Sequence, residues 1–450
     1  MNVSKGREEL NNSLSKSIIG DVSWVYGVWN MDQYFLYLLS LRSILWWADK
    51  DKEIILPDAD PKIQYTLRKF KDNLLFTLDL SDSQVSTGDF KKLSNPNTRS
   101  PYMRTPYYFD DSNYILNIQD LLEKVRFLGD KVGLADFLKN NGFDKFLPSN
   151  TEIFTKWNNF DKAVKEAKIR FQNKQSFIIK AGEWASWENM VLVKFFENKA
   201  TVYHHQALKW KTILTFEQLL EEIDVAIPIS QRIKKWWFDS KWYNKNLIKE
   251  QFFLVQDLID VKKYKEKSIN FYIWDKIFPT AYGTNIAVWW VHKGNIEEQI
   301  PDWLLQKFLP ILEKIKEYGY YWPIGFDFFL QDTNLDIKII EANTRFTAPI
   351  SPSMLVYKLE RQWKIPSWWT WKLIQKFDTT IDLTDINSLK KYNLVESLLK
   401  EEDIKSAKFL AYSPVFSKKY QSIIILWPTQ ETISELENKI YSIISWNGKY

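Results

Sequence analysis

The sequence predicts a mixed α/β fold of the α+β kind, divided among more than one domain. Three observations support this prediction: short apolar strands alternate with amphipathic helices, a β-hairpin is predicted near residue 334, and 45% of the 450 residues are hydrophobic. A chain of this length and hydrophobicity can bury a large core and exceeds the usual size of one domain. We expect a small N-terminal α/β domain over 1–105, a larger core over 106–375, and a small α+β extension over 376–450.

The first of these segments carries the pattern of a small α/β unit. Two short apolar strands, Ser43–Trp47 and Glu53–Pro57, flank a charged turn, and the helical pattern of Lys62–Lys71 follows them. The segment 94–105 is polar and contains two prolines, so we expect it to be a connector.

The central segment alternates strands with helices. We expect apolar strands at Phe177–Lys180 and Phe252–Ile259, and a helix over Phe216–Ile223 whose first turn a capping box of Thr215 and Gln218 closes. The remaining expected elements are helices over 118–128, over 134–140 and from Pro301 to Gly319, then a strand at Ile423–Leu426 and a helix from Pro428 in the C-terminal extension.

Composition and charge exclude several classes of protein. The formal net charge of +5 is too small for a nucleic-acid-binding face, and no apolar run reaches the roughly 20 residues that span a bilayer. The start, MNVSKGREEL, lacks the apolar core of a signal peptide, so we expect a cytoplasmic protein. Cysteine is absent, which excludes a thiolate zinc site and a cysteine nucleophile.

The hairpin contains the most informative polar residues. Its strands, Gly325–Leu330 and Ile337–Arg345, surround a polar turn, and Glu341 and Asn343 point to one face because they are two residues apart. A register centred near Asn334 places Asp327 opposite Glu341, with Cβ atoms about 5 Å apart.

Two carboxylates this close repel one another unless a cation lies between them. Asp327, Glu341 and Asn343 offer hard oxygen ligands that suit Mg²⁺, with Mn²⁺ as an alternative, and Arg345 is placed to meet a phosphate or a carboxylate. The alternative is an acidic hairpin on a solvent-facing surface. That alternative predicts polar neighbours, whereas the flanking residues are small or apolar: Gly325, Phe329, Ile337 and Ile339.

The tryptophan and glycine counts are unusual. The chain has 22 tryptophans and only 13 glycines, where about 32 glycines are expected at the usual share of roughly 7%. Some bacterial lineages read the codon UGA as glycine, and translating such a gene with UGA as tryptophan would give these counts. The alternative is a protein that is truly rich in tryptophan.

On these residues the chain resembles the ATP-grasp superfamily of carboxylate–amine ligases. Its members share a G-x-D strand and an E-x-N strand that holds the metal, matched here by Gly325-Phe326-Asp327 and Glu341-Ala342-Asn343. The resemblance implies that a pre-grasp-like N-terminal domain is followed by an ATP-grasp core with a mobile lid at about 175–260. It implies that ATP and Mg²⁺ are bound, that Lys131 and Lys180 contact the phosphates, and that Arg345 steadies an acyl phosphate.

The resemblance also implies a phosphate-covering loop after Lys180 and a hinge strand that holds adenine through backbone groups. The loop residues are Gly182, Glu183 and Ser186, and the hinge residues are Gln256, Asp257, Leu258 and Ile259. The loop departs from the family pattern at Trp184 and Trp187, where glycine is usual and lets the backbone approach phosphates. The hinge departs at Gln256, where an acidic residue is common, and Glu266 is the candidate for the ribose contact.

Within the superfamily the chain looks most like peptide ligases of the pheganomycin type. Those enzymes place a motif like Ile44–Asp49 and a strand ending like Leu56-Pro57 ahead of the core, and their C-terminal part resembles Leu410–Pro414. The resemblance then implies an ATP-dependent ligase that joins a small-molecule or peptide carboxylate to an amine through an acyl phosphate. A homodimer is left open.

Two other hypotheses remain. One is an ATP-grasp enzyme with a different acceptor, such as a carboxylase or a nucleotide-precursor ligase; the other is a homologue that binds nucleotide without turnover. Two further features are expected to have no binding role. We expect His204-His205 to be an exposed pair rather than a metal site, and the lysine-rich segment 261–267 to be a solvated turn.

Overall fold

The computed structural model describes the following residues of the chain: 3–13, 17–19, 53–57, 85–88, 98–99, 124–125, 127–156, 158–182, 190–197, 199–204, 207, 209–228, 233–235, 248–288, 291–345, 347–362, 365, 369–378, 408–414 and 420–427. The chain divides into two compact units, and each is described by itself. The first comprises 1–122, 267–325 and 345–450, and the second comprises 123–266 and 326–344. The predicted domain boundaries at 105 and 375, and the lid, stay predictions.

The second unit is built on a six-stranded antiparallel sheet with the order β5-β12-β6-β7-β8-β9. Its strands are β5 (Glu152–Phe154), β6 (Phe177–Ala181), β7 (Met190–Phe196), β8 (Lys199–Tyr203), β9 (Lys211–Ile213) and β12 (Phe253–Asp257). Both strands predicted in this region, at 177–180 and within 252–259, are therefore confirmed. A separate two-stranded sheet joins β10 (Ile233–Lys235) to β11 (Ile248–Glu250).

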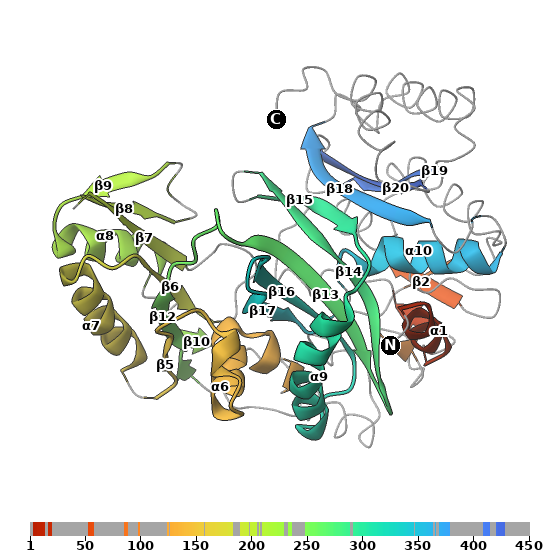
Figure 1. Ribbon diagram of the computed structural model, residues 1–450, viewed down its shortest axis with the longest axis horizontal. Helices are drawn as coiled ribbons and strands as arrows, with labels where there is room; N and C mark the ends of the chain where they lie inside the picture. The colour runs from red at the N-terminus through yellow and green to blue at the C-terminus, as the bar shows by residue number, and fades with distance from the viewer. Residues whose placement is uncertain are drawn as a thin grey trace. The chain divides into compact units, whose positions relative to one another are not determined.

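Two helices cover one face of this sheet, α7 (Asn159–Gln172) and α8 (Phe216–Ala226) (Figure 1). Alanines 163 and 167 of α7 and Leu219 and Ile223 of α8 pack on alternate strand residues such as Phe177, Ile179, Val191 and Val193 to form one buried core. The intervening strand residues, among them Ile178 and Lys180, therefore point to the opposite face. That face carries the candidate site.

Local sequence explains where the helices of this unit begin. The Thr215 hydroxyl accepts from the Gln218 amide, and the Gln218 side chain accepts from the Thr215 amide, so the predicted capping box at the start of α8 is confirmed. The helix predicted over 134–140 is α6 (Lys131–Asn140), which begins three residues earlier because the Asp130 carboxylate accepts from the amides of Val132 and Gly133. A single 3₁₀ turn, η3 (Asp144–Phe146), follows.

The predicted hairpin is also present. Its strands are β16 (Pro323–Gln331) and β17 (Asp336–Asn343), and Leu335 takes a positive φ of 55° in the turn between them. Because β17 ends at Asn343, the expectation that Arg345 continues the strand face is wrong: Arg345 lies beyond the last ladder residue.

The described part of the first unit contains long antiparallel strands and the helices α1, α9 and α10. Its strands pair successively in the order β13 (Lys265–Ile273), β14 (Ile277–Val288), β15 (Val291–Glu297), β18 (Thr370–Asp378), β20 (Tyr420–Trp427) and β19 (Lys408–Pro414). The helix predicted from Pro301 is α9 (Asp302–Glu317), with Gly319 at a φ of 89° directly after its end. The other helices are α1 (Val3–Ser13) and α10 (Ile350–Arg361).

The N-terminal segment forms a parallel four-stranded sheet with the order β3-β2-β1-β4. Strand β2 (Glu53–Pro57) confirms the predicted strand, and β1 (Ser17–Ile19) and β3 (Val85–Gly88) pair with it. The connector prediction for 94–105 is wrong at β4 (Thr98–Arg99), which pairs with β1. Strand β20 contains the strand predicted at 423–426. The predicted elements at 43–47, at 62–71 and after Pro428 lie outside the described residues.

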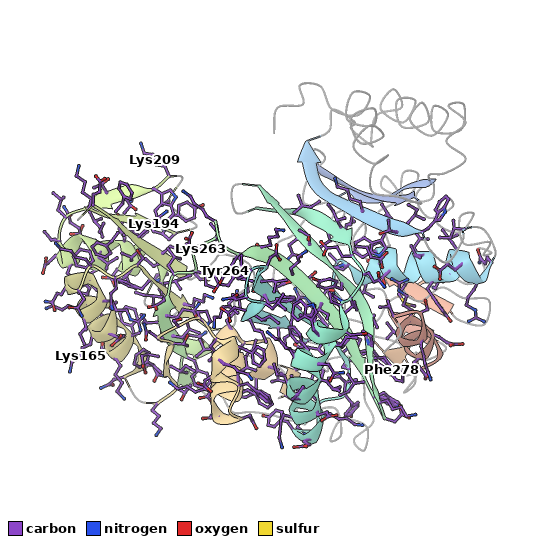
Figure 2. The ribbon with its side chains drawn as sticks, in the orientation of Figure 1. Lys165, Lys194, Lys209, Lys263, Tyr264 and Phe278 are labelled. Atoms are coloured by element: carbon purple, nitrogen blue, oxygen red, sulfur yellow. The ribbon has the colours of Figure 1, made fainter. Side chains whose placement is uncertain are left out.

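Two smaller findings concern surfaces. The turn at 261–263 is exposed, as predicted, with Lys263 pointing outward (Figure 2), whereas Lys267 at the other end of that lysine-rich segment is buried in β13 and pairs with Glu298. Among the described helices, none combines the length and apolarity that a membrane crossing requires.

Candidate functional site

The site begins with Lys180 at the end of β6. Its side chain is only 6% exposed and lies on the face opposite α7 and α8. The register pairs Lys180 with Met190 on one side and with Leu254 on the other, so these three side chains share that face. A lysine placed this deeply in a sheet needs an anionic partner or loses its charge.

The loop that begins after β6 is held tightly at Gly182. Its amide donates to the Phe252 carbonyl, and its carbonyl accepts from the buried Gln251 side chain. A Cβ at this position would overlap the Asp130 carboxylate, which caps α6, so the close approach requires glycine. Glu183, Trp184, Ser186 and Trp187 lie outside the described residues, and their predicted roles stay predictions.

The cap at Asp130 places the next residue, Lys131, beside β17. Lys131 is 8% exposed, and its Nζ lies 3.3 Å from Oε2 of Glu341. Directly after β17 the Thr344 hydroxyl donates to the Val125 carbonyl at 2.8 Å. One contact therefore ties β17 to the start of α6, and a second ties the residue after β17 to the segment that precedes α6.

The three predicted metal ligands converge in the structure. The Asn343 amide nitrogen donates to Oδ2 of Asp327 at 3.0 Å and to Oε1 of Glu341 at 3.4 Å. Two carboxylates and an amide this close fit a hard divalent cation, because turning the amide over would present its oxygen to the ion. Among the described residues no group of three or more histidine or carboxylate side chains is suited to a metal. The predicted set contains two carboxylates, and its third member is an amide, so its role as a metal site stays a prediction.

The charges of the site act on one another. The pKa of Lys180 is lowered to about 8, chiefly because the side chain is buried and also because Lys131 is positively charged, while the negative charge of Glu341 partly opposes both effects. The charges of Lys131 and Glu341 therefore both act on Lys180. A group carrying several negative charges, such as a phosphate chain, would relieve the repulsion between them.

A small apolar patch lies on the same face as Lys180. Ile178, Met190 and Leu192 are buried there, with Tyr203 and Leu258 packed against them. These three side chains are 2–5% exposed and form an apolar layer beside Lys180. Apolar surroundings of this kind are what the flat base of a nucleotide needs. The continuous apolar run of β6, in which alternate residues face opposite sides, is the signal in the sequence that points to this layer.

The predicted hinge residues, at the end of β12, point to both faces of the sheet. Gln256 is buried and pairs in register with Ile178, so its side chain lies on the Lys180 face, while Leu258 packs against the apolar patch. Asp257 points to the helix-covered face instead and pairs with Arg170 of α7. The amides of Asp257 and Leu258 already donate to the carbonyls of Ser149 and Ser176.

Three other predicted residues lie elsewhere. Arg345 belongs to the first unit and Glu266 is half-buried in β13, so neither predicted role is tested. The prediction of an exposed histidine pair is wrong for His204, which is 1% exposed and contacts Oε2 of Glu222 through Nε2 at 2.8 Å. His204 directly follows β8, and its contact with Glu222 of α8 accompanies its burial. His205 lies outside the described residues.

Solved structures resemble this fold at low sequence identity. The N5-carboxyaminoimidazole synthase of Aspergillus clavatus, in complex with ADP and 5-aminoimidazole ribonucleotide, is 11% identical with a TM-score of 0.50, and the match covers 96% of this chain and 98% of that one. The N5-carboxyaminoimidazole ribonucleotide synthetase of Thermus thermophilus is 9% identical with a TM-score of 0.50, covering 96% and 99%. The sequence matches no family model and no curated protein.

The likeness establishes the class of fold. The chain has the mixed α/β fold of these enzymes, which confirms the predicted fold class. What the chain does with that fold follows from the chemistry of its own residues.

Proposed function

We propose that the chain is an ATP- and Mg²⁺-dependent ligase that forms an amide or peptide bond through an acyl phosphate. One observation carries the proposal: the buried Lys131 meets a set of two carboxylates and an amide, with its Nζ 3.3 Å from Glu341. The second buried lysine, Lys180, feels the charges of both Lys131 and Glu341. Phosphates and a divalent cation are the ligands that need both signs of charge in one place.

In this proposal each group keeps the role that its charge suits. Lys131 and Lys180 hold the phosphates, and Asp327, Glu341 and Asn343 hold the cation, which neutralises the phosphate chain when it is bound. The apolar patch of Ile178, Met190 and Leu192 receives the base. Catalysis is then positioning and charge neutralisation, which needs no covalent nucleophile and agrees with a chain that has no cysteine.

In the proposed site, Lys131 and Glu341 change partners when the ligand binds. Without a ligand, the buried charge of Lys131 is paired with the half-buried charge of Glu341. When a metal–nucleotide complex binds, Glu341 turns to the cation and Lys131 to a phosphate, so neither charge is left unpaired.

The reaction balances without a further reactant. A carboxylate oxygen attacks the γ-phosphorus, the bond to the β-phosphate oxygen breaks, and ADP leaves. An amine then attacks the acyl carbon, inorganic phosphate leaves, and the amine gives up a proton. Arg345 would steady the acyl phosphate.

The finer assignments belong to the same proposal. The substrates are an amino-acid or peptide carboxylate and an amine, as in pheganomycin-type peptide ligases, in a cytoplasmic protein with domains at 1–105, 106–375 and 376–450. Glu183 and Ser186 cover the phosphates, and Gln256, Asp257, Leu258 and Ile259 position the adenine. Glu266 is the candidate for the ribose.

The test is ADP release with defined substrate pairs. The full chain is incubated with ATP, MgCl₂ and panels of amino acids and dipeptides, and ADP and amide product are measured. ADP formation that requires both a carboxylate and an amine supports the ligase. ADP formation only with bicarbonate and an aminoimidazole ribonucleotide would instead indicate another acceptor. The Aspergillus clavatus structure contains 5-aminoimidazole ribonucleotide. Nucleotide binding without turnover would indicate a homologue that has lost catalysis.

A further inference from the structure

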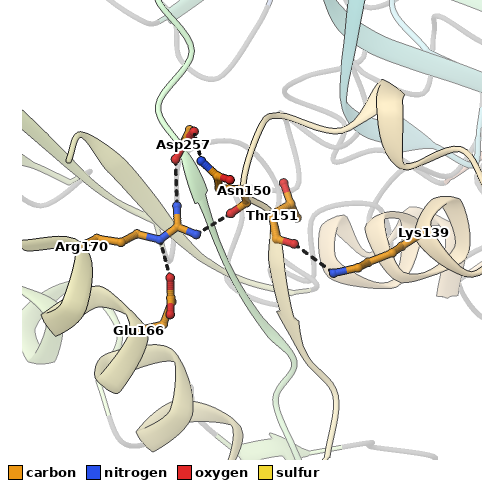
Figure 3. A network of polar contacts seen from close by, with 6 residues as sticks. All are labelled: Lys139, Asn150, Thr151, Glu166, Arg170 and Asp257. Carbon is orange, nitrogen blue, oxygen red and sulfur yellow. Dashed lines mark hydrogen bonds and ion pairs between the residues drawn. The ribbon is translucent and has the colours of Figure 1, made fainter. Parts of the chain in front are cut away.

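A buried arginine ties three elements of the second unit together at the end of the hinge strand. Arg170 of α7 is only 3% exposed. Its guanidinium donates to Oε1 of Glu166 at 2.7 Å, to Oδ1 of Asp257 at 3.0 Å, and to the Asn150 carbonyl (Figure 3). Each edge of the planar group is thus used by a different partner, an arrangement that lysine cannot reproduce.

Asp257 and the loop before β5 are joined at further points. The Asn150 side chain donates to Oδ2 of Asp257 at 2.8 Å, and the Asp257 amide donates to the Ser149 carbonyl at 3.1 Å. Asn150 takes a positive φ of 49°, a conformation that asparagine tolerates better than most residues. On the other side of this loop the Thr151 carbonyl accepts from Lys139 of α6 at 3.3 Å (Figure 3).

The network lies on the opposite face of the sheet from the candidate site. Asp257 faces α7, while its neighbours Gln256 and Leu258 face Lys180 and the apolar patch. Holding the Asp257 carboxylate therefore fixes the backbone of its two neighbours without any contact between Arg170 and a ligand.

We propose that Arg170 is a positioning residue for the base of the nucleotide, acting through Asp257 on the hinge residues Gln256 and Leu258. This inference rests on the proposed function, because it assumes that the face with Lys180 and the apolar patch binds a nucleotide. Loss of the network loosens the base end of the site and leaves the phosphate end, which Lys131 and Lys180 build, in place.

The test compares two ligands on the full chain by calorimetry. ADP with Mg²⁺ uses both ends of the site, and inorganic triphosphate with Mg²⁺ uses only the phosphate end. For Arg170→Lys we expect the Kd of ADP to rise about tenfold, the equivalent of one lost charge-assisted hydrogen bond. We expect the Kd of triphosphate to stay within about twofold, and the preference for ADP over GDP to fall.

A matched control separates position from stability. Glu166→Gln removes the charge of one partner of Arg170 but leaves the contacts to Asp257 and Asn150, so ADP affinity should stay within about twofold even if Tm falls. A second variant, Asn150→Gly, removes the amide–carboxylate contact at an exposed position whose positive φ suits glycine, so it should fold and should weaken ADP binding selectively.

The outcomes are distinguishable. Selective loss of ADP binding in Arg170→Lys or Asn150→Gly supports the inference. Equal losses for ADP and triphosphate, or no loss in either variant, overturn it while the proposed function stands. Wild-type protein that binds neither ligand overturns the proposed function and this inference with it.

Discussion

The two ends of the candidate nucleotide site are built on different principles. The phosphate and metal end consists of charged side chains that touch one another, such as Lys131 and Glu341. The base end consists of apolar side chains and backbone, held in place from behind by Arg170. The phosphate and metal end depends on the charges of particular side chains, whereas the base end depends on how the strands are placed in the sheet.

This difference predicts unequal consequences of mutation. Removing a charge at the phosphate end leaves an opposite charge buried and unpaired, which costs several kcal/mol. Removing a contact at the base end changes the fit of one surface, which costs about 1 kcal/mol.

The largest effect is expected at Glu341. Glu341→Gln removes a predicted metal ligand and leaves Lys131 without its acidic partner, so kcat for ADP formation should fall at least about a hundredfold. Steady-state rates at saturating ATP and Mg²⁺ measure the effect. The matched control is Asp332→Asn, an exposed acid in the turn of the same hairpin that pairs with Lys265. If Asp332→Asn loses as much activity as Glu341→Gln, the hypothesis that Glu341 binds the metal is contradicted.

The next effect concerns the loop after Gly182. If Trp184 and Trp187 are glycines in the native protein, then replacing both by glycine in protein made with tryptophan should raise the ligase rate about tenfold or more, because glycine lets backbone amides reach the phosphates. Replacing both by alanine removes the bulk without that conformational freedom and should help less. An intact mass of native-source protein that agrees with 22 tryptophans would contradict the glycine interpretation.

The contrast between the two ends explains what sequence could foresee. The convergence of Asp327, Glu341 and Asn343 could be predicted because their spacing on two strands of one hairpin is local. Lys180 was proposed from the family resemblance, and its role stays a prediction. The chain's strands were found where apolar runs were strong, as in β6 and β12.

Arg170 could not be found in this way. It is 87 residues from Asp257 along the chain, and on a helix its pattern looks like an ordinary polar position with an i,i+4 partner at Glu166. Its importance comes from burial and from the pairing of β12 with β5 and β6, which are properties of the tertiary structure. The same holds for His204, which is buried after the end of β8 and contacts Glu222 of α8, 18 residues further along the chain.

A moderate effect is expected from pH. In the ligand-free protein the pKa of Lys180 is lowered to about 8, and a bound phosphate favours the charged form. Below pH 8 the lysine is already charged and ADP affinity should be flat with respect to this group. Above pH 8 each binding event takes up a proton, and affinity should fall by up to about tenfold per pH unit. Calorimetry at pH 7 and pH 9 in buffers of different ionisation enthalpy detects the uptake.

Lys180→Arg provides the control for that prediction. Arginine stays charged throughout this range, so the variant should lose the dependence on pH above 8 even if its affinity is lower. An unchanged dependence in Lys180→Arg would assign the proton to another group.

The smallest effect is expected in the apolar patch and is the most direct comparison of the two ends. Met190 pairs in register with Lys180 and contributes apolar surface to the face with Ile178 and Leu192. Met190→Ala should weaken ADP binding about fivefold, because it removes about 1 kcal/mol of contact with the base, and should leave triphosphate binding unchanged. The neighbouring Val191 points to the opposite, helix-covered face, so Val191→Ala should lower Tm without altering the ratio of the two affinities. A change of that ratio in Val191→Ala equal to the one in Met190→Ala would mean that the ratio reports general loosening of the sheet, and the base would then have to bind elsewhere than on this patch.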